Sequence, residues 1–205
     1  VHIDIPKDIT AEVADFIYPE EINLPTYKPT INFNKRQLKK AMEAISTAKK
    51  PLLYVGGGAI LSNCAYEIRE LAKKLNIPAV ETLMARGVMG DENPLFFGML
   101  GMHGEYSANM AAHETDLLIS LGARFDDRVT GRLDEFASKA KVIHVDIDPT
   151  SIAKLVVPDY PIVGDLKVTV KAMIEAVEEY EFNDYSNQLC KTGIKAPGCP
   201  LCSLI

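Results

Sequence analysis

The sequence predicts an α/β fold in which helices cover both faces of a doubly wound, Rossmann-like parallel sheet. Short apolar runs alternate along the chain with longer amphipathic stretches, which is the pattern of repeated strand–helix units. Strands of this kind are buried on both faces, and right-handed crossovers between them place successive helices on the two sides of one sheet.

The composition is that of a globular protein and excludes several classes of partner. The 205 residues include 22 Lys and Arg and 28 Asp and Glu, so the formal net charge is −6. This mild acidity gives no electrostatic reason to bind nucleic acid or an anionic membrane. The sequence also lacks a run of about 18 apolar residues, the length needed to span a bilayer. The 4 cysteines are too few for a disulfide framework and indicate a reducing, cytoplasmic-type compartment.

Two segments precede the strand–helix units. Apolar and polar residues alternate over 1–5, as in a half-buried strand, and Pro6 ends that pattern. We interpret 1–9 as the last strand of a preceding domain. The following stretch, 10–33, is rich in proline without a clean apolar period and is predicted to be a linker.

The strand–helix units occupy residues 34–180, which we predict to be the central domain. Asn34 can cap a helix whose apolar residues Leu38, Met42 and Ile45 recur at helical spacing. Further on, strands are predicted at 52–55, 78–81, 116–121, 141–146 and about 160–163. Helices are predicted at 62–75, at about 105–113, after Asp148-Pro149 and from Asp165 to about Tyr180. The stretch 83–104 is predicted to be irregular. Residues 181–205 lose the pattern and are predicted to be a disordered tail, whose sequence we interpret as foreign to the domain.

Candidate site residues are those that directly follow the strands. In doubly wound sheets, ligands bind beyond the carboxyl ends of the strands, close to the point where the strand order reverses. The residues predicted to stand there are Gly56, Gly57, Gly58, Thr82, Leu83, Met84, Arg86, Gly122, Arg124, Asp126, Asp127, Arg128, Asp146, Asp148, Gly164 and Asp165.

The glycine triplet 56–58 admits two interpretations. Successive glycines let a backbone approach a ligand closely, and the amides of the next helix could face a phosphate. A tight strand-to-helix turn would explain the same residues. Leu61 occupies the third glycine position of a GxGxxG motif, so the dinucleotide fingerprint is absent and Glu81 is the only residue that supports a nicotinamide site.

The segment GARFDDRVTG, 122–131, is the most unusual part of the sequence. Arginine forks such as those of Arg124 and Arg128 can hold phosphate or flavin oxygens, while Asp126 could take ribose hydroxyls or hold an arginine. An exposed cluster of ion pairs is the alternative. His103 could lie at the edge of a flat ring packed on Met102, or be an ordinary loop histidine.

Other polar groups have simpler explanations. Helix capping alone accounts for Asp165. No group of His, Cys, Asp and Glu has the spacing of a metal site, and the single CxxC at 199–202 lacks a second pair.

The chain resembles the central domain of acetohydroxyacid synthase (acetolactate synthase) large subunits, which are thiamine-diphosphate enzymes. The specific motifs are GMLGMHG and RFDDRVTG. The stretches that match, in order, are VHIDIPKDIT (1–10), YVGGGAI (54–60), ETLMARGVMG (81–90), FFGMLGMHG (96–104), LGARFDDRVTG (121–131), VIHVDIDPTSIAK (142–154) and PIVGD (161–165).

The resemblance implies a central FAD-binding domain between two domains that bind thiamine diphosphate, the second of them with Mg²⁺. It implies condensation of two pyruvates to 2-acetolactate, or of pyruvate with 2-ketobutyrate, on the route to isoleucine, valine and leucine. It further implies a homodimer or tetramer of catalytic subunits, a regulatory small subunit, and a bacterial-type cytoplasm, with a plastid as the alternative.

At the level of residues, the resemblance implies two sets of contacts. Asp127 and Arg128 correspond to the substrate channel that inhibitors occupy. The implied FAD contacts are Gly56, Gly57, Gly58, Thr82, Leu83, Met84, Leu100, Gly101, Met102, His103, Gly122, Arg124, Asp126, Arg128, Val129, Asp146, Ile147, Gly164 and Asp165.

No catalytic residue of the family is expected within 1–205. The family's diphosphate motif begins GDG and ends in paired asparagines, and neither feature occurs in these residues. We therefore expect this stretch by itself to be inactive. The alternatives are the central domain of another thiamine-diphosphate carboligase or decarboxylase, an NAD-binding Rossmann module, and a scaffold that has lost its nucleotide.

Overall fold

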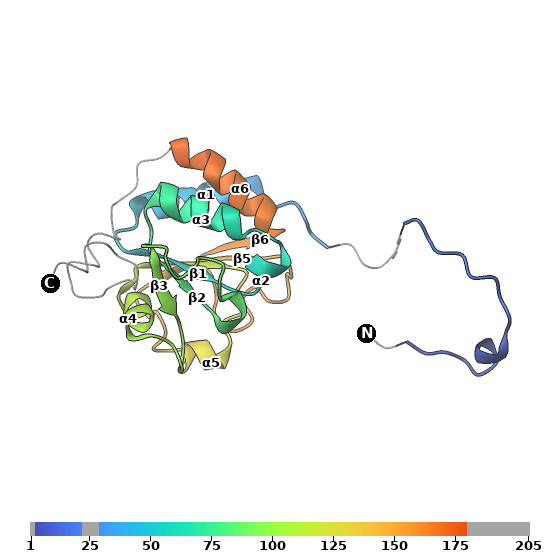
Figure 1. Ribbon diagram of the computed structural model, residues 1–205. Helices are drawn as coiled ribbons and strands as arrows, with labels where there is room; N and C mark the ends of the chain where they lie inside the picture. Colours follow the sequence, from blue (N-terminus) through green and yellow to red (C-terminus); the bar gives the residue numbers. More distant parts are fainter. Residues whose placement is uncertain (1–2, 22–28, 180–205) are drawn as a thin grey trace.

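The computed structural model describes residues 3–21 and 29–179, and in these ranges it contains one six-stranded parallel sheet (Figure 1). The strand order is β3-β2-β1-β4-β5-β6, which confirms the predicted doubly wound α/β fold. The order reverses between β1 and β4, so the carboxyl ends of these two strands border the crevice where such sheets bind ligands. The strands are β1 (Pro51–Val55), β2 (Ala79–Glu81), β3 (Phe96–Met99), β4 (Leu117–Leu121), β5 (Lys141–Asp146) and β6 (Tyr160–Val163).

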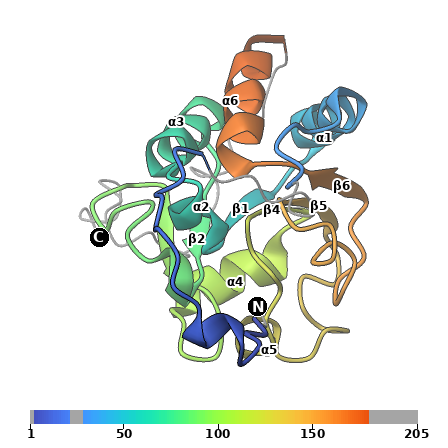
Figure 2. The ribbon, with the colours of Figure 1, turned by 90° about the vertical axis from the view of Figure 1, so that its right-hand side faces the viewer.

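Helices cover both faces of the sheet (Figure 2). Three of them, α1 (Lys35–Thr47), α3 (Ala65–Leu75) and α6 (Leu166–Ala176), lie side by side on one face. The other face carries α4 (Tyr106–Glu114) and α5 (Asp127–Thr130), and the short α2 (Gly58–Leu61) follows β1. Single 3-10 turns form η1 (Ile9–Ala11), η2 (Leu83–Ala85) and η3 (Val177–Glu179).

The sheet separates two layers of the hydrophobic core. Leu53 and Val55 of β1 pack in the layer beneath α1, α3 and α6, whereas Leu52 and Tyr54 pack in the layer on the α4 side. Every residue of β1 and of β4 is buried. This burial on both faces explains why the central strands appear in the sequence as continuous apolar runs.

Local signals explain the boundaries of the helices on the three-helix face. The side chain of Asn34 accepts hydrogen bonds from the amides of Arg36 and Gln37, as expected for the cap of α1. Asp165 caps α6 in the same way through the amide of Val168. Asn76 ends α3 in the left-handed conformation.

Two predictions about elements were wrong. The stretch 83–104 is not irregular throughout, because it contains β3, which escaped notice since Gly98 interrupts a short run. No regular helix follows Asp148, whose carboxylate instead accepts bonds from the amide and hydroxyl of Thr150 and closes a local turn. Residues 3–5 carry no strand assignment, and the interpretation of 1–9 as the last strand of a preceding domain stays a prediction.

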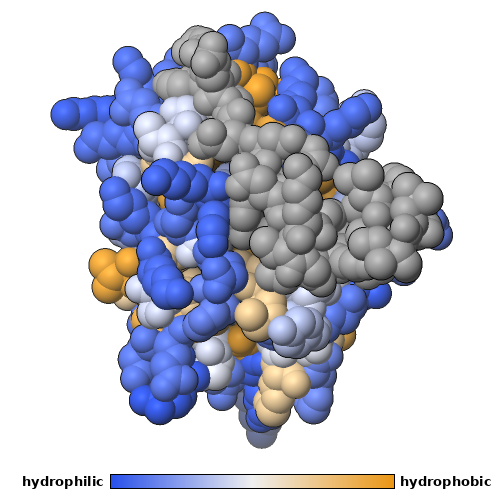
Figure 3. Space-filling view, turned by 90° about the vertical axis from the view of Figure 1, so that its left-hand side faces the viewer, coloured by the Kyte–Doolittle hydropathy of each residue, from blue (hydrophilic) through white to orange (hydrophobic). Residues whose placement is uncertain are grey.

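Other expectations lie outside the described residues, namely those for 1–2 and for 181–205, with Cys190, Cys199 and Cys202. The face shown in Figure 3 is largely hydrophilic among the described residues, with small separate hydrophobic spots. None of the helices in the described ranges is long and apolar enough to cross a membrane.

Candidate functional site at the carboxyl edge of the sheet

The loops that follow β1 and β4 are packed directly against each other. The amide of Gly58 donates to the carbonyl of Gly122 over 3.0 Å. A Cβ on Gly56 would lie 2.3 Å from the Gly122 carbonyl oxygen, and one on Gly58 would lie 2.8 Å from the Gly122 Cα. Glycine is therefore required at these positions by contact between two loops, whatever ligand binds there.

The amides at the start of α2 are already used within the turn. Ala59 donates to the carbonyl of Gly56, and Ile60 donates to that of Gly57. The expectation that the helix after the glycine triplet would turn free amides toward a phosphate is therefore not met. Contact with the loop after β4 accounts for glycine at 56 and 58, whereas Gly57 faces the loop after β2, at Met84.

The loop after β2 presents apolar side chains to solvent at the same edge. Leu83 is 71% exposed and Met84 is 73% exposed, which is unusual for large apolar residues beside a buried strand. The hydroxyl of Thr82 is buried and has no hydrogen-bond partner within the described residues. Such a group is a candidate for a bond to a ligand.

The side chain of Glu81, at the end of β2, anchors the loop that follows this strand. The side chain is completely buried, and its two carboxylate oxygens accept the amides of Gly87 and Met89. Burial raises the pKa of Glu81. On the other side of the loop, Arg69 donates to the carbonyls of Gly87 and Val88. Because Glu81 is enclosed and already bonded, it is unavailable to a ribose, and the nicotinamide hypothesis loses its only supporting residue.

The segment after β3 joins the segment after β4. The amide of Met102 donates to the carbonyl of Arg128 over 3.0 Å, and Gly101, with φ of +121°, packs against the same carbonyl. The side chain of Asn109 on α4 bonds both the amide and the carbonyl of Gly101. Met102 and His103 are exposed at this junction. The sequence motifs did not predict the role of Asn109, because it depends on a contact between separate elements.

Buried and exposed residues alternate over 123–126, and 126–128 are all exposed. Ala123 and Phe125 are buried, whereas Arg124 and Asp126 are exposed. The carboxylate of Asp126 accepts the amide of Arg128 and caps α5. That hydrogen bond, together with the nearby Arg124 and Arg128 charges, lowers the pKa of Asp126.

Arg124 is exposed and forms no ion pair within 4.0 Å among the described residues. Asp127 and Arg128 form an exposed pair with 3.8 Å between Oδ1 and Nε. A cavity of about 140 Å³ is lined by Arg124, Asp126, Ser151, Lys154 and Leu155. Ser151 and Lys154 were not among the predicted contacts, although both lie in the matching stretch 142–154, because nothing local to the turn after β5 indicates that they face Arg124.

The ends of β5 and β6 complete the edge. The amide of Gly164 donates to the carbonyl of Asp146 over 3.0 Å. Both carboxylate oxygens of Asp165 are used, one by the Val168 amide and one by the Ser62 hydroxyl at 2.8 Å. The cap interpretation of Asp165 is thus sufficient, and Ile147, which directly follows β5, is exposed.

The predicted contact residues therefore follow all six strands and share one edge of the sheet. The strand β3 explains why the 100–103 segment belongs to this edge. Contacts link the 56–58 loop to Gly122, the 82–84 loop to Gly57, and the 101–102 segment to Arg128. A cluster of three or more His, Cys, Asp or Glu suited to a metal ion is absent from the described part of the chain.

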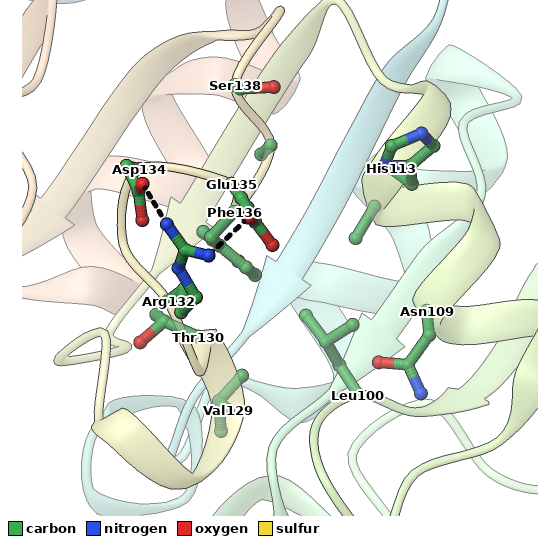
Figure 4. A pocket seen from close by; sticks show the side chains of 12 residues that line it. Leu100, Asn109, His113, Val129, Thr130, Arg132, Asp134, Glu135, Phe136 and Ser138 are labelled. Carbon is green, nitrogen blue, oxygen red and sulfur yellow. Dashed lines mark hydrogen bonds and ion pairs between the residues drawn. The ribbon is translucent and has the colours of Figure 1, made fainter.

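A larger cavity of about 430 Å³ lies beside this edge, between α4 and the segment after α5 (Figure 4). It includes Leu100 and Val129 of the predicted contacts and is otherwise lined by side chains such as His113 and Phe136. Arg132 at its rim is paired with two neighbouring carboxylates, at 2.8 and 2.9 Å.

Comparisons with known proteins agree with the fold and the motifs. The family model described as the thiamine pyrophosphate enzyme central domain matches residues 38–173. The acetolactate synthase large subunit of Cyanidium caldarium is 46% identical over 194 residues, which is 92% of this chain and 33% of that protein. The acetolactate synthase of Mycobacterium avium is 50% identical over 173 residues, 84% of this chain and 28% of that protein.

A third relative, the acetolactate synthase large subunit of Haemophilus influenzae, is 45% identical over 181 residues, which is 87% of this chain and 32% of that protein. The chain thus spans about a third of the length of the curated relatives it matches. With its parallel sheet and its match over more than half of its length, the chain belongs to the thiamine pyrophosphate enzyme central-domain family and is similar to the matching part of acetolactate synthase large subunits.

Proposed function

We propose that this chain is the FAD-binding central domain of an acetolactate synthase large subunit, with FAD lying along the carboxyl edge of the sheet. The proposed enzyme condenses two pyruvates to 2-acetolactate, or pyruvate with 2-ketobutyrate, in the synthesis of branched-chain amino acids. Thiamine diphosphate and Mg²⁺ would be bound by residues outside 1–205. FAD performs no net redox step in the reaction that the resemblance implies, so its contribution would be structural.

The observation that carries the proposal is the combination of exposed apolar side chains and an exposed arginine at one edge. Leu83, Met84 and Met102 are large, apolar and exposed there, which suits packing against a flat aromatic ring. Arg124 is exposed close by, and a guanidinium suits the diphosphate of FAD. The hydroxyl of Thr82, which has no hydrogen-bond partner among the described residues, could bond the ligand at the same edge.

The proposed contacts assign different tasks to different loops. The 82–84 and 100–103 segments would pack against the flavin ring, and Arg124 and Arg128 would neutralise phosphate charge. Polar groups at Asp146 and Asp165 face the same edge and would stand near the nucleotide end, although Asp165 already has two partners. Asp127 and Arg128 would border the substrate channel. Each assignment is a proposal from the resemblance and from position on the edge.

Residues 1–205 by themselves are proposed to lack carboligase activity, because they contain neither a GDG sequence nor paired asparagines. The complete enzyme is proposed to be a cytoplasmic dimer or tetramer of large subunits with a regulatory small subunit, and to act on small 2-keto acids. Turnover of pyruvate by this chain alone, supplied with thiamine diphosphate, Mg²⁺ and FAD, would contradict the first of these statements.

Thermal unfolding with FAD, ADP and NAD added separately tests the binding proposal. At a hundred times its dissociation constant, a ligand that binds only the folded state stabilises it by about 2.7 kcal/mol. We expect FAD to stabilise the chain most, and Arg124→Gln to weaken that effect. Arg132→Gln is the matched control, since Arg132 lies at the neighbouring cavity. Selective stabilisation by NAD would favour a nicotinamide module, and no stabilisation by any of the three would favour a scaffold.

A further inference from the structure

A buried histidine lies beneath the 122–128 loop and has no role in the site proposed above. His144 extends from β5 and is completely buried. Its Nε2 lies 2.9 Å from the carbonyl oxygen of Ala123. Its ring meets that of Phe125 edge to face, with centroids 5.0 Å apart and an interplanar angle of 88°. Ala123 and Phe125 are the two neighbours of Arg124, so one side chain contacts the loop on both sides of that arginine.

The backbone of this loop depends on contacts from below. Phe125 has a φ of +56°, a conformation that residues with a side chain rarely adopt and keep only where their surroundings impose it. Besides His144, its ring packs on Tyr54 and Phe136, with centroids 5.5 and 6.3 Å away. Because Ala123 and Phe125 are anchored inward, Arg124 between them is left exposed at the edge of the sheet.

The contact with Ala123 assigns the tautomer of His144. A carbonyl oxygen can only accept, so Nε2 carries the proton and donates it. The Nδ1 atom has no hydrogen-bond partner within the described residues. Two polar groups lie nearby: the Ser120 hydroxyl, 3.4 Å from the same carbonyl, and the Asp146 carboxylate, 3.9 Å from Nε2. Burial lowers the pKa of His144, which keeps the ring neutral near pH 7.

We propose that His144 is a positioning residue for the cofactor site, which holds the 122–128 loop in the conformation that presents Arg124 at the edge of the sheet. It does so through the bond from Nε2–H to Ala123 and the ring contact with Phe125. The inference rests on the proposed function, in which Arg124 contacts the diphosphate of FAD.

Amide hydrogen exchange of the loop tests the inference without any ligand. His144→Leu removes the donor, whereas His144→Gln keeps an N–H donor. Tyr54→Phe is the matched control, because it keeps a ring against Phe125 and removes a hydroxyl that has no partner in the described structure. We expect exchange over 123–128 to be about tenfold faster in His144→Leu and within about threefold of wild type in the other two variants, while β1 and β4 exchange as in wild type.

FAD titration of the same variants gives the second readout. The affinity should fall about tenfold in His144→Leu and be largely restored in His144→Gln, since one hydrogen bond is worth about a factor of ten. Equal exchange in His144→Leu and wild type would overturn the inference. Equal acceleration in the Leu and Gln variants would overturn it as well, because the donor would then be irrelevant.

A measurement on the unmodified protein covers the case in which His144→Leu does not fold. The ¹⁵N shifts of the His144 ring at pH 7 should show a neutral ring protonated at Nε2, and a ring protonated at Nδ1 or at both nitrogens would contradict the inference. Failure of the wild type to bind FAD would refute the proposed function instead, while the exchange data would still decide the role of His144 in the loop.

Discussion

The packing of the loops after β1 and β4 makes a sharp prediction about two adjacent glycines. A Cβ on Gly56 would lie 2.3 Å from the carbonyl oxygen of Gly122 and 2.4 Å from the Cα of Ala123. Both are backbone atoms, so neither can rotate away. A Cβ on Gly57 would lie 3.0 Å from the Cβ of Met84, in a loop exposed to solvent that would have to move by only a few tenths of an ångström. The two glycines therefore differ in what surrounds them, although they are neighbours in the chain.

Gly56→Ala should lower the free energy of unfolding by about 1–3 kcal/mol, which is the usual cost of overpacking a site that cannot relax. Gly57→Ala should stay within about 0.5 kcal/mol of wild type, or gain slightly because alanine restricts the unfolded chain. Urea unfolding followed by circular dichroism measures both, since the protein has no tryptophan. If Gly57→Ala proves the more damaging variant, or if Gly56→Ala is neutral, the contact between the two loops is not as described.

Three further predictions concern stability and reactivity. Asp165→Ala removes the cap of α6 and the bond from Ser62, so the free energy of unfolding measured in urea should fall by about 1–2 kcal/mol. The control Asp134→Ala, at an exposed residue, should lower it by less than about 0.5 kcal/mol. Equal losses in the two variants would contradict the role of Asp165 as a cap. Burial raises the pKa of the Cys64 thiol to about 12, so Cys64 should not react with iodoacetamide at pH 8 until urea unfolds the chain, as measured by peptide mapping. Rapid labelling of Cys64 in the folded protein would contradict this prediction. Burial also raises the pKa of Glu81, so the folded state keeps the carboxyl proton to higher pH than the unfolded state does. The free energy of unfolding should therefore fall as the pH rises from about 4.3 through the folded pKa. In urea titrations, Glu81→Gln should remove this pH dependence, and an unchanged pH profile would contradict the prediction.

Elements whose signals are local were predictable from the sequence. The helix α1 begins after Asn34 because one side chain bonds the free amides that follow it, and its buried residues recur at helical spacing. The strands β1 and β4 were predictable from apolar runs that are buried throughout. The strand β3 was not, because Gly98 occupies the middle of a short segment.

Roles that depend on contacts between distant segments could not be predicted. The reason for glycine at 56 lies in the backbone of Gly122, which no local pattern reveals. The carboxylate of Glu81 accepts the amides of Gly87 and Met89, and no local pattern in the sequence indicates these bonds. The sequence shows only that His144 has no partners at the spacing of a metal site, and its contact with Ala123 is visible in the structure alone. The edge of the sheet was foreseeable, whereas the side chains that support its loops were not.

The most direct test of the proposed FAD site is the footprint of FAD in amide hydrogen exchange. The proposal predicts slower exchange in the loops after β1, β2, β3 and β4, at 56–58, 82–84, 100–103 and 122–129, with β1 and β4 themselves unchanged. Protection confined to the cavity between α4 and residues 130–138, or no protection at saturating FAD, would contradict it.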